Sequence, residues 1–234
     1  MTDDLSIGAL VNNHPAPWPV VIPLHGRFVT LVGLDPVRHA SALYAGTHGD
    51  DQARMWRYLP DGPYKDRAAF DRSLAQKALS TDPLFFTILD RANGEPVGYL
   101  AYMRMDPPSR VIEVGHVVFS RQLQRRPGAT EAIYLLARHT FDALGYRRFE
   151  WKCDSLNAPS RRAAERFGFT FEGIFRQHKI VKGRNRDTSW YAMLDSEWPN
   201  RKDAFERWLA ASNFDATGQQ QQTLEQIRAS APSQ

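Results

Sequence analysis

The sequence contains a single cysteine, Cys153, among its 234 residues. One cysteine forms no intrachain disulfide and cannot supply a zinc site built from several cysteines, so we expect no structural metal. The sequence also lacks the uninterrupted run of ~18 apolar residues that a membrane-spanning helix requires. Its first residues are not a basic stretch followed by an apolar segment, so we expect no secretory signal. These absences together predict a cytoplasmic protein with no membrane partner.

The composition is that of an ordinary folded domain. Hydrophobic residues make up 42% of the chain and charged residues 24%, and both fractions are close to globular averages. This balance excludes a disordered, collagen-like or coiled-coil protein. At ~100–200 residues per domain, the length fits one large domain or two small ones.

The positive charge is concentrated in one part of the chain. The whole protein has a formal net charge of +4, but residues 121–186 contain 15 Lys and Arg against 6 Asp and Glu, a net charge of +9. The remainder has a net charge of −5. A basic segment in an otherwise acidic protein suggests a phosphate-bearing partner, either a nucleic acid or a phosphorylated cofactor. A solvated basic face is the structural alternative.

Apolar spacing and turn residues predict the order of the secondary structure. Asp35 and Pro36 are typical of a helix start, and Gly168 is typical of a helix end. The predicted strands are residues 27–34, 84–90, 96–105, 111–119, 149–153, 169–181 and 188–194, and the predicted helices begin at 36 and cover 66–79, 130–144, 159–167 and 201–211. Antiparallel hairpins precede a strand–helix–strand unit whose two strands must be parallel. We therefore predict one α/β domain with a mixed sheet.

The two ends of the chain differ from its middle. Residues 1–26 are rich in proline and predict an extended N-terminal arm that lies on the domain. Residues 27–212 form the predicted domain. Residues 213–234 contain a run of glutamines and almost nothing to bury, so we expect a mobile C-terminal tail.

A basic, glycine-containing turn follows the predicted strand that ends at Phe119. It includes Arg125, Arg126, Gly128 and Ala129, and a helix is predicted to open directly after it. The unpaired N–H groups and the positive dipole end of a helix N-terminus form an anion site. Small residues would let the backbone approach the anion, and the arginines would add positive charge. An ordinary strand–helix turn is the alternative interpretation.

Two motifs together resemble the central region of the GNAT superfamily of N-acetyltransferases, closest to its RimJ/RimL-like branch, which acetylates ribosomal-protein N-termini. The first is Glu113-Val114-Gly115, followed by Gln124 and by Ala129-Thr130-Glu131; the second is Asn157, Ser160 and the Gly168-Phe169 pair. The resemblance covers about residues 27–195. Pro127 departs from it, because the family has a glycine there and proline lacks an N–H.

The resemblance implies a fold, a cofactor and the residues that hold it. The expected fold is a single α/β domain with a mixed, mostly antiparallel central sheet, a splayed parallel strand pair and helices on both faces. The expected cofactor is acetyl-CoA, the acetyl donor. The residues that would hold it are Val118, Phe119, Gln124, Arg125, Arg126, Gly128, Ala129, Thr130, Asn157 and Arg162. Alternatively, Asn157 only caps a helix and the arginines only lie on the surface.

Acetyl transfer to an amine requires a proton acceptor for the amine and a proton donor for the leaving thiolate. By resemblance Ser160 is the donor, with an ordinary first-turn serine as the alternative. Glu113 would accept the amine proton through water, unless it is only a paired strand carboxylate. His178 has a suitable ordinary pKa, and a hydrogen-bonded sheet histidine is its alternative. His116 is a weaker candidate for the same task.

The acceptor side is less well marked. Trp56, Tyr58 and His116 are the residues we expect to bind the acceptor, although the aromatic pair is equally consistent with core or lid positions. The resemblance implies an acetyl-CoA-dependent N-acetyltransferase that acts directly on a primary amine, either a protein N-terminus or a small molecule.

Two other functions remain open at this point. Because Pro127 lacks an N–H that the family's glycine would supply, an acyl-CoA-binding protein with weak or no catalysis is a second possible function. The basic segment suggests a nucleic-acid-binding module, which is disfavoured because its charges are not interleaved with aromatics. We therefore expect an amine acceptor as partner, no specific nucleic acid, and a monomer or a homodimer.

Overall fold

An eight-stranded sheet forms the centre of the computed structural model, which describes residues 7–50 and 52–230. The strands are β1 (Leu24–His25), β2 (Val29–Gly33), β3 (Leu84–Asp90), β4 (Pro96–Asp106), β5 (Val111–Phe119), β6 (Arg148–Asp154), β7 (Thr170–Val181) and β8 (Arg184–Leu194). They lie in the order β1-β2-β3-β4-β5-β6-β8-β7. Among the described strands only β5 and β6 are parallel neighbours. The predicted mixed, mostly antiparallel sheet is therefore confirmed.

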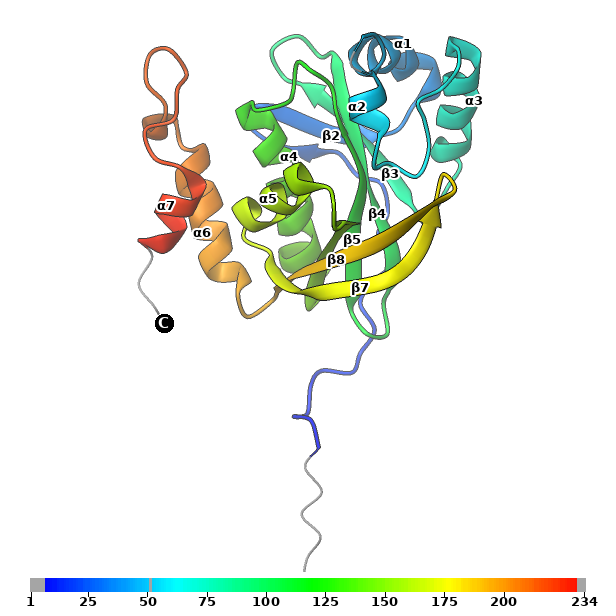
Figure 1. The fold of residues 1–234 in the computed structure, drawn as a ribbon. Helices are drawn as coiled ribbons and strands as arrows, with labels where there is room; N and C mark the ends of the chain where they lie inside the picture. The colour runs from blue at the N-terminus through cyan, green and yellow to red at the C-terminus, as the bar shows by residue number, and fades with distance from the viewer. Residues whose placement is uncertain (1–6, 51, 231–234) are drawn as a thin grey trace, which may run out of the picture.

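Helices cover both faces of this sheet (Figure 1). They are α1 (Pro36–Thr47), α2 (Gln52–Trp56), α3 (Arg67–Ala78), α4 (Pro127–Arg138), α5 (Ala158–Phe167), α6 (Trp198–Leu209) and α7 (Leu224–Ala229). One core, which includes Ile133 and Phe149, packs α4, α5, α6 and α7 on one face. A second core, which includes Leu43 and Phe70, packs α1, α2 and α3 on the other. No helix in the described part of the chain is both long and apolar enough to cross a membrane.

The crossover between the parallel strands contains α4, which begins at Pro127 and not at the predicted Thr130. Proline suits the first helical position, because an N–H there has no helical acceptor. The α-helix ends at Arg138 and continues as a π-helical turn over His139–Ala143. The whole segment therefore ends close to the predicted end at Leu144, but its N-terminus lies nearer to β5 than expected.

The hairpin between β7 and β8 is tighter than the sequence suggested. The predicted strands 169–181 and 188–194 leave a longer connection between them, but β8 begins at Arg184 and the turn consists of Lys182 and Gly183. Both have positive φ angles, of 50° and 72°. This conformation matches the twist of the flanking strands in a two-residue hairpin turn. Arg186 therefore lies on a strand and not in a loop.

The C-terminal segment buries more than expected, and the prediction of a tail with almost nothing to bury is wrong for its described part. Helix α7 begins with a capping box formed by Thr223 and Gln226. Leu224 and Ile227 have exposed fractions of 1% and 2% and join the core. Helix α2 and strand β1 were also not predicted. The division into arm, domain and tail stays a prediction, and residues 1–6 and 231–234 lie outside the described residues.

Candidate functional site

The two parallel strands separate partway along their length. Strand β5 pairs with β6 from Val111 to Val114, whereas β6 continues along β8 as far as Asp154. Beyond Val114, β5 pairs only with β4, through a bulge where His116 has a φ angle of 48°. The β6-facing backbone groups of residues 115–119 therefore have no strand partner among the described residues. Such an edge can pair with an extended ligand.

The predicted anion turn lies at the end of this free edge. Gln124, Arg125 and Arg126 are exposed, while Ala129 and Thr130 are buried in the first turn of α4. Gln124 folds back, and its side-chain amide donates to the carbonyl of Phe119 at 2.9 Å. The exposed arginines and the start of α4 together form a basic helix N-terminus, as the sequence predicted.

Gly128 has a packing role, while its predicted part in cofactor binding stays a prediction. A Cβ at this position would lie 2.7 Å from Cγ1 of Val29 and 3.1 Å from Cδ1 of Leu123. The glycine is therefore required by the packing of α4 against β2, because no side chain fits there. The side chain of Val118, with an exposed fraction of 2%, also belongs to the core, which leaves its backbone as the part that can meet a ligand.

Asn157 and Ser160 lie at the start of α5, directly after β6. The side-chain oxygen of Asn157 accepts from the amide of Ser160 at 3.2 Å, so Asn157 is the N-cap of this helix. The indole of Trp151 donates to Oγ of Ser160 at 3.0 Å. Burial raises the pKa of the Cys153 thiol, although a hydrogen bond with Ser160 opposes the shift. A hydroxyl that accepts from Trp151 still has its own proton to donate.

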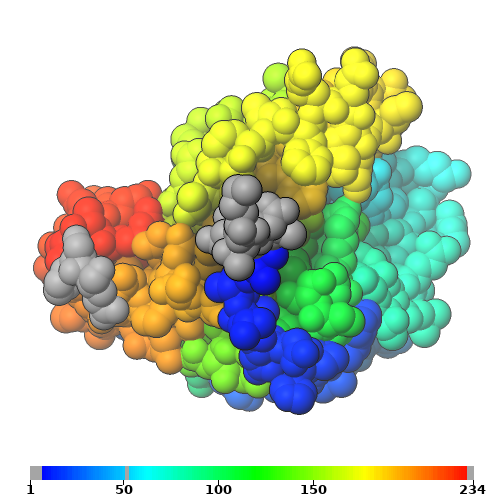
Figure 2. Space-filling view, turned by 90° about the horizontal axis from the view of Figure 1, so that it is seen from below, coloured from blue at the N-terminus to red at the C-terminus, as the bar shows by residue number. Residues whose placement is uncertain are grey.

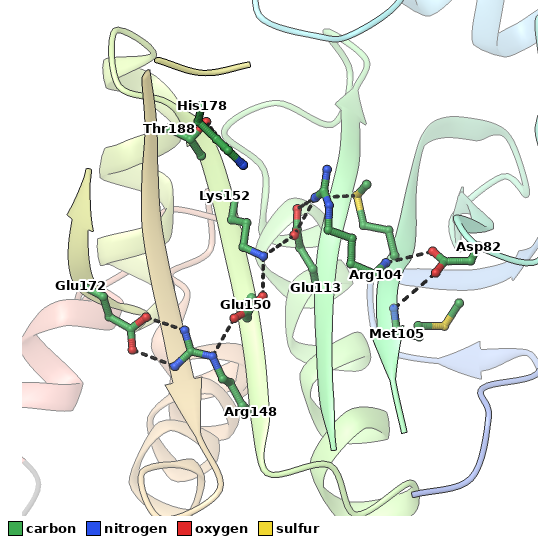
Figure 3. Close-up of polar contacts among 11 residues, drawn as sticks. Asp82, Arg104, Met105, Glu113, Arg148, Glu150, Lys152, Glu172, His178 and Thr188 are labelled. Carbon is green, nitrogen blue, oxygen red and sulfur yellow. Dashed lines mark hydrogen bonds and ion pairs between the residues drawn. The ribbon is translucent and has the colours of Figure 1, made fainter. Parts of the chain in front are cut away.

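Glu113 lies near one end of a chain of alternating charges on the sheet face opposite to Trp151 (Figure 3). With an exposed fraction of 2%, it accepts from Arg104 at 2.6 Å and pairs with Nζ of Lys152 at 3.0 Å. Lys152 also pairs with Glu150 at 2.6 Å. The chain continues through Arg148, which binds both Glu150 and the more exposed Glu172. The paired-carboxylate alternative for Glu113 is thus observed, while its part in proton transfer stays a prediction.

His178 lies on the same face, where β7 bulges beside β8. Its Nδ1 is 3.0 Å from Oγ1 of Thr188, which leaves Nε2 available. Burial lowers the pKa of His178, and nearby positive charges, from Lys179 first, lower it further. The imidazole is therefore neutral over a wider pH range than an ordinary histidine, as a proton acceptor requires.

His116 is the second histidine near the free edge of β5. Its ring centroid lies 5.1 Å from that of Phe85. Burial lowers its pKa, and Asp61 opposes that shift. The structure therefore brings both predicted histidines to the side of the sheet that carries Glu113, whereas Ser160 contacts Trp151 in the core of the other side.

Two predicted acceptor residues, Trp56 and Tyr58, lie on or just after α2. Trp56 belongs to the core, and Tyr58 lies nearer the surface. Trp56 has an exposed fraction of 0%, and its indole donates to the carbonyl of Thr47, so the prediction that its side chain lines the acceptor site is wrong. Tyr58 is half-buried and donates to the carbonyl of Leu156 at 3.1 Å. Lys182, at the β7–β8 turn, donates to the carbonyl of Trp56 at 2.8 Å.

These contacts connect three segments across the end of β5. The space-filling view shows the yellow region that includes β7 at the top of the molecule and the cyan region around α3 beside it on the right (Figure 2). Tyr58, in the loop after α2, contacts the β6–α5 connection, and Lys182 of the β7–β8 turn contacts the last residue of α2. Segments far apart in the sequence therefore meet where we predicted the acceptor to bind.

Sequence reasoning missed Arg104 and Lys152, which hold Glu113. A usable signal existed for Lys152, because Arg148, Glu150 and Lys152 alternate along a predicted strand and must share one face. Nothing in the local sequence marks Arg104 as the partner of Glu113, since the two residues meet only through the β4–β5 pairing.

Comparisons with known proteins agree with this geometry. The family model described as acetyltransferase (GNAT) domain matches residues 30–170. The crystal structure of a GCN5-related N-acetyltransferase from Brucella melitensis is 48% identical, with a TM-score of 0.91, and the match covers 93% of this chain and 99% of that one. YdaF of Bacillus subtilis, named as a proposed ribosomal N-acetyltransferase, is 27% identical over 110 residues, which are 47% of this chain and 60% of YdaF.

A third protein shares the fold at lower identity. The microcin self-immunity acetyltransferase MccE, solved with acetyl-CoA and AMP, is 20% identical with a TM-score of 0.64, and the match covers 72% of this chain and 93% of MccE. The free edge of β5, the basic start of α4 and the match of the family model lead to the same assignment. The chain belongs to the GNAT family of N-acetyltransferases, which use acetyl-CoA as the acetyl donor.

Proposed function

We propose that the protein transfers the acetyl group of acetyl-CoA directly to a primary amine, on a protein N-terminus or on a small molecule. The observation that carries this proposal is the free backbone edge of residues 115–119 beside the start of α4. An extended, amide-containing arm can pair with that edge, and a pyrophosphate can meet the N–H groups at the start of α4. The donor therefore fits the residues present.

In this arrangement the backbone of Val118 and Phe119 would pair with the pantetheine arm. The turn from Gln124 to Thr130 would hold the pyrophosphate, with Arg125 and Arg126 adding charge from exposed positions. Arg162, also exposed, would reach a cofactor phosphate. Asn157, as the N-cap of α5, would position the start of that helix beside the thioester.

The proton transfers are assigned to groups on the two sides of the sheet. His178, through its free Nε2, would accept the proton of the attacking amine, with Glu113 as a carboxylate on the same face. Ser160 would donate its hydroxyl proton toward the leaving thiolate while Trp151 donates to its oxygen. Tyr58 and His116 would border the acceptor.

We further propose that the protein is a member of the RimJ/RimL-like branch that acts in the cytoplasm. The motif around Glu113 and the similarity to YdaF support this proposal. Whether the chain is a monomer or a homodimer stays a prediction.

Acetyl-CoA is expected to stabilise the folded protein by mass action. At a ligand concentration of 100 times Kd the gain is about 2.7 kcal/mol. At about 2–4 °C per kcal/mol for a chain of this size, the melting temperature should rise by about 5–10 °C. The measurement is a thermal scan with acetyl-CoA, with pantetheine as the control that lacks the pyrophosphate, followed by a screen of amine acceptors that detects free thiol. No thermal shift at millimolar acetyl-CoA would remove the proposed function, whereas a shift without turnover would favour a binding protein.

The pH dependence of acetyl transfer is expected to follow His178. Its pKa is lowered from 6.5, so the neutral, proton-accepting form persists below that pH and kcat/KM should fall only at more acidic values. The measurement is kcat/KM against pH for the native protein, His178→Gln and His116→Gln. In His178→Gln, kcat/KM should no longer fall at acidic pH, whereas in His116→Gln this acidic limb of the profile should remain. An acidic limb that His178→Gln leaves in place would exclude His178 as the proton acceptor.

A further inference from the structure

Positive side chains crowd the acceptor face of β7 and β8. Lys179 and Arg186 are direct cross-strand partners in the β7–β8 pairing, and like charges at directly opposed positions destabilise a sheet. Burial lowers the pKa of Lys179, and the charges of Arg104 and Arg186 lower it further, while Glu113 opposes the shift. Burial lowers the pKa of Arg186 as well, and Asp154 and Glu113 oppose that shift. The protein thus holds these cations close together at a cost to its own stability.

The same strand face presents buried hydrogen-bond donors without acceptors. Nε of Arg186 and Nε1 of Trp190 are both buried, and neither has a partner among the described residues. These two residues lie on the same face of β8, because side chains at even spacing share a face. Buried polar groups in native proteins are almost always hydrogen-bonded, so two orphaned donors on one face indicate that acceptor oxygens come from a ligand.

The carboxylates near Lys179 and Arg186 already have other hydrogen-bond or ion-pair partners. Glu113 binds Arg104 and Lys152. Asp154 accepts from the amide of Leu156 at 2.9 Å. Asp187 accepts from the amide of Gln177 at 2.8 Å and from the side chain of Asn185 at 3.0 Å. Within the described part of the chain, none of the three carboxylates forms an ion pair with Lys179 or Arg186.

We propose that the preferred acceptor is an amine whose molecule also carries an anionic group, a carboxylate or a phosphate, bound by Arg186 and Lys179. This inference rests on the proposed function, because it names the substrate class of the same site. Arg186 supplies a planar set of N–H donors suited to either anion, and Lys179 supplies a second positive charge. Since Lys179 adjoins His178, a group bound there would place the amine beside the proposed proton acceptor.

The test uses two pairs of dipeptide amides as acceptors. Alanyl-glutamate amide is compared with alanyl-glutamine amide, and alanyl-phosphoserine amide with alanyl-serine amide. The anionic member of a pair should have a kcat/KM about 10-fold to 100-fold higher, the range for hydrogen bonds to a charged group. The pair with the larger ratio identifies carboxylate or phosphate as the recognised group. In Arg186→Gln and in Lys179→Gln that ratio should fall towards one.

The matched control is Arg184→Gln, which removes the same charge from an exposed position on the same strand. It should leave the ratio unchanged. A ratio of one or less in the native protein, or an equal loss in Arg184→Gln, would overturn the proposal.

A second readout, equilibrium binding of the same peptides to the CoA-saturated protein, does not depend on turnover. Anion-dependent binding that Arg186→Gln abolishes, without acetylation, would keep this inference and reject the proposed transfer. Acetylation without a preference for the anionic peptides would keep the proposed transfer and reject this inference. If the protein showed neither a binding preference nor acetylation, both proposals would be rejected.

Discussion

Replacing Glu113 with Gln should reduce the free energy of unfolding by about 3–5 kcal/mol, the cost of removing one partner of a buried ion pair. The substitution keeps the shape of the side chain, so it leaves no cavity. It removes the charge that faces Arg104 and Lys152, and the Lys152 side chain has an exposed fraction of 6%. At about 2–4 °C per kcal/mol, this is a large shift in melting temperature for a chain of this length. Urea denaturation gives the free energy, and an unchanged m-value would show that the unfolded state is unaffected.

The control is Glu172→Gln, the same substitution at the exposed end of the same chain of charges. Glu172 pairs with Arg148, and its side chain has an exposed fraction of 39%. Solvent-exposed ion pairs contribute about 0–1 kcal/mol, so this variant should remain close to the native protein. Equal effects of the two variants would mean that burial does not decide the strength of these pairs, and the structural role assigned to Glu113 would be wrong.

Replacing Ser160 with Ala should lower kcat by about 10²–10⁴-fold, the usual contribution of a general acid. The KM for acetyl-CoA should change little, because the hydroxyl is proposed to act on the leaving thiolate and not on the bound cofactor. The change also leaves the indole N–H of Trp151 without its acceptor, which costs about 1–3 kcal/mol of stability for a buried donor. Steady-state kinetics and a thermal scan on the same sample measure both effects.

Trp151→Phe separates chemistry from structure, because it removes the same hydrogen bond and keeps the Ser160 hydroxyl. It should lose stability and retain most of kcat, while Ser160→Thr, which also keeps a hydroxyl, should retain activity. If Ser160→Ala and Trp151→Phe lowered kcat equally, the serine would be a structural residue of the β6–α5 connection. Its assignment as the proton donor would then be withdrawn.

Local signals in the sequence were sufficient wherever the determining interactions are local. Asp35 caps α1 by accepting from the amides of Val37 and Arg38, as predicted. Gly168 ends α5 with a φ angle of 91°, a conformation that glycine adopts without a steric penalty. Both depend on contacts within a few residues of the chain. The spacing of such signals was therefore enough to predict the mixed sheet, although α4 begins at Pro127 and not at the predicted Thr130.

Residues whose surroundings come from distant segments were predicted less well. Trp56 looked like an acceptor residue because it lies in an aromatic loop, yet its indole is buried against α1 and α3. Nothing in the local sequence shows that Gly128 is also required by packing, because a side chain there would collide with Val29 of β2. We expected the tail to bury almost nothing. In its described part, however, Leu224 and Ile227 are buried because α6 provides a surface for them.

The sequence by itself determined the order of most elements, the family and the donor, because these depend on patterns that lie within single segments of the chain. The tertiary structure alone decided which charges meet on the sheet face that carries Glu113. Arg104 reaches Glu113 across a strand pairing, and Lys152 reaches it across the parallel β5–β6 pair. Lys179 meets Arg186 only because a two-residue turn sets the register of the last hairpin. Electrostatic interactions depend on distance in space and on burial, and neither quantity is determined by spacing along the chain.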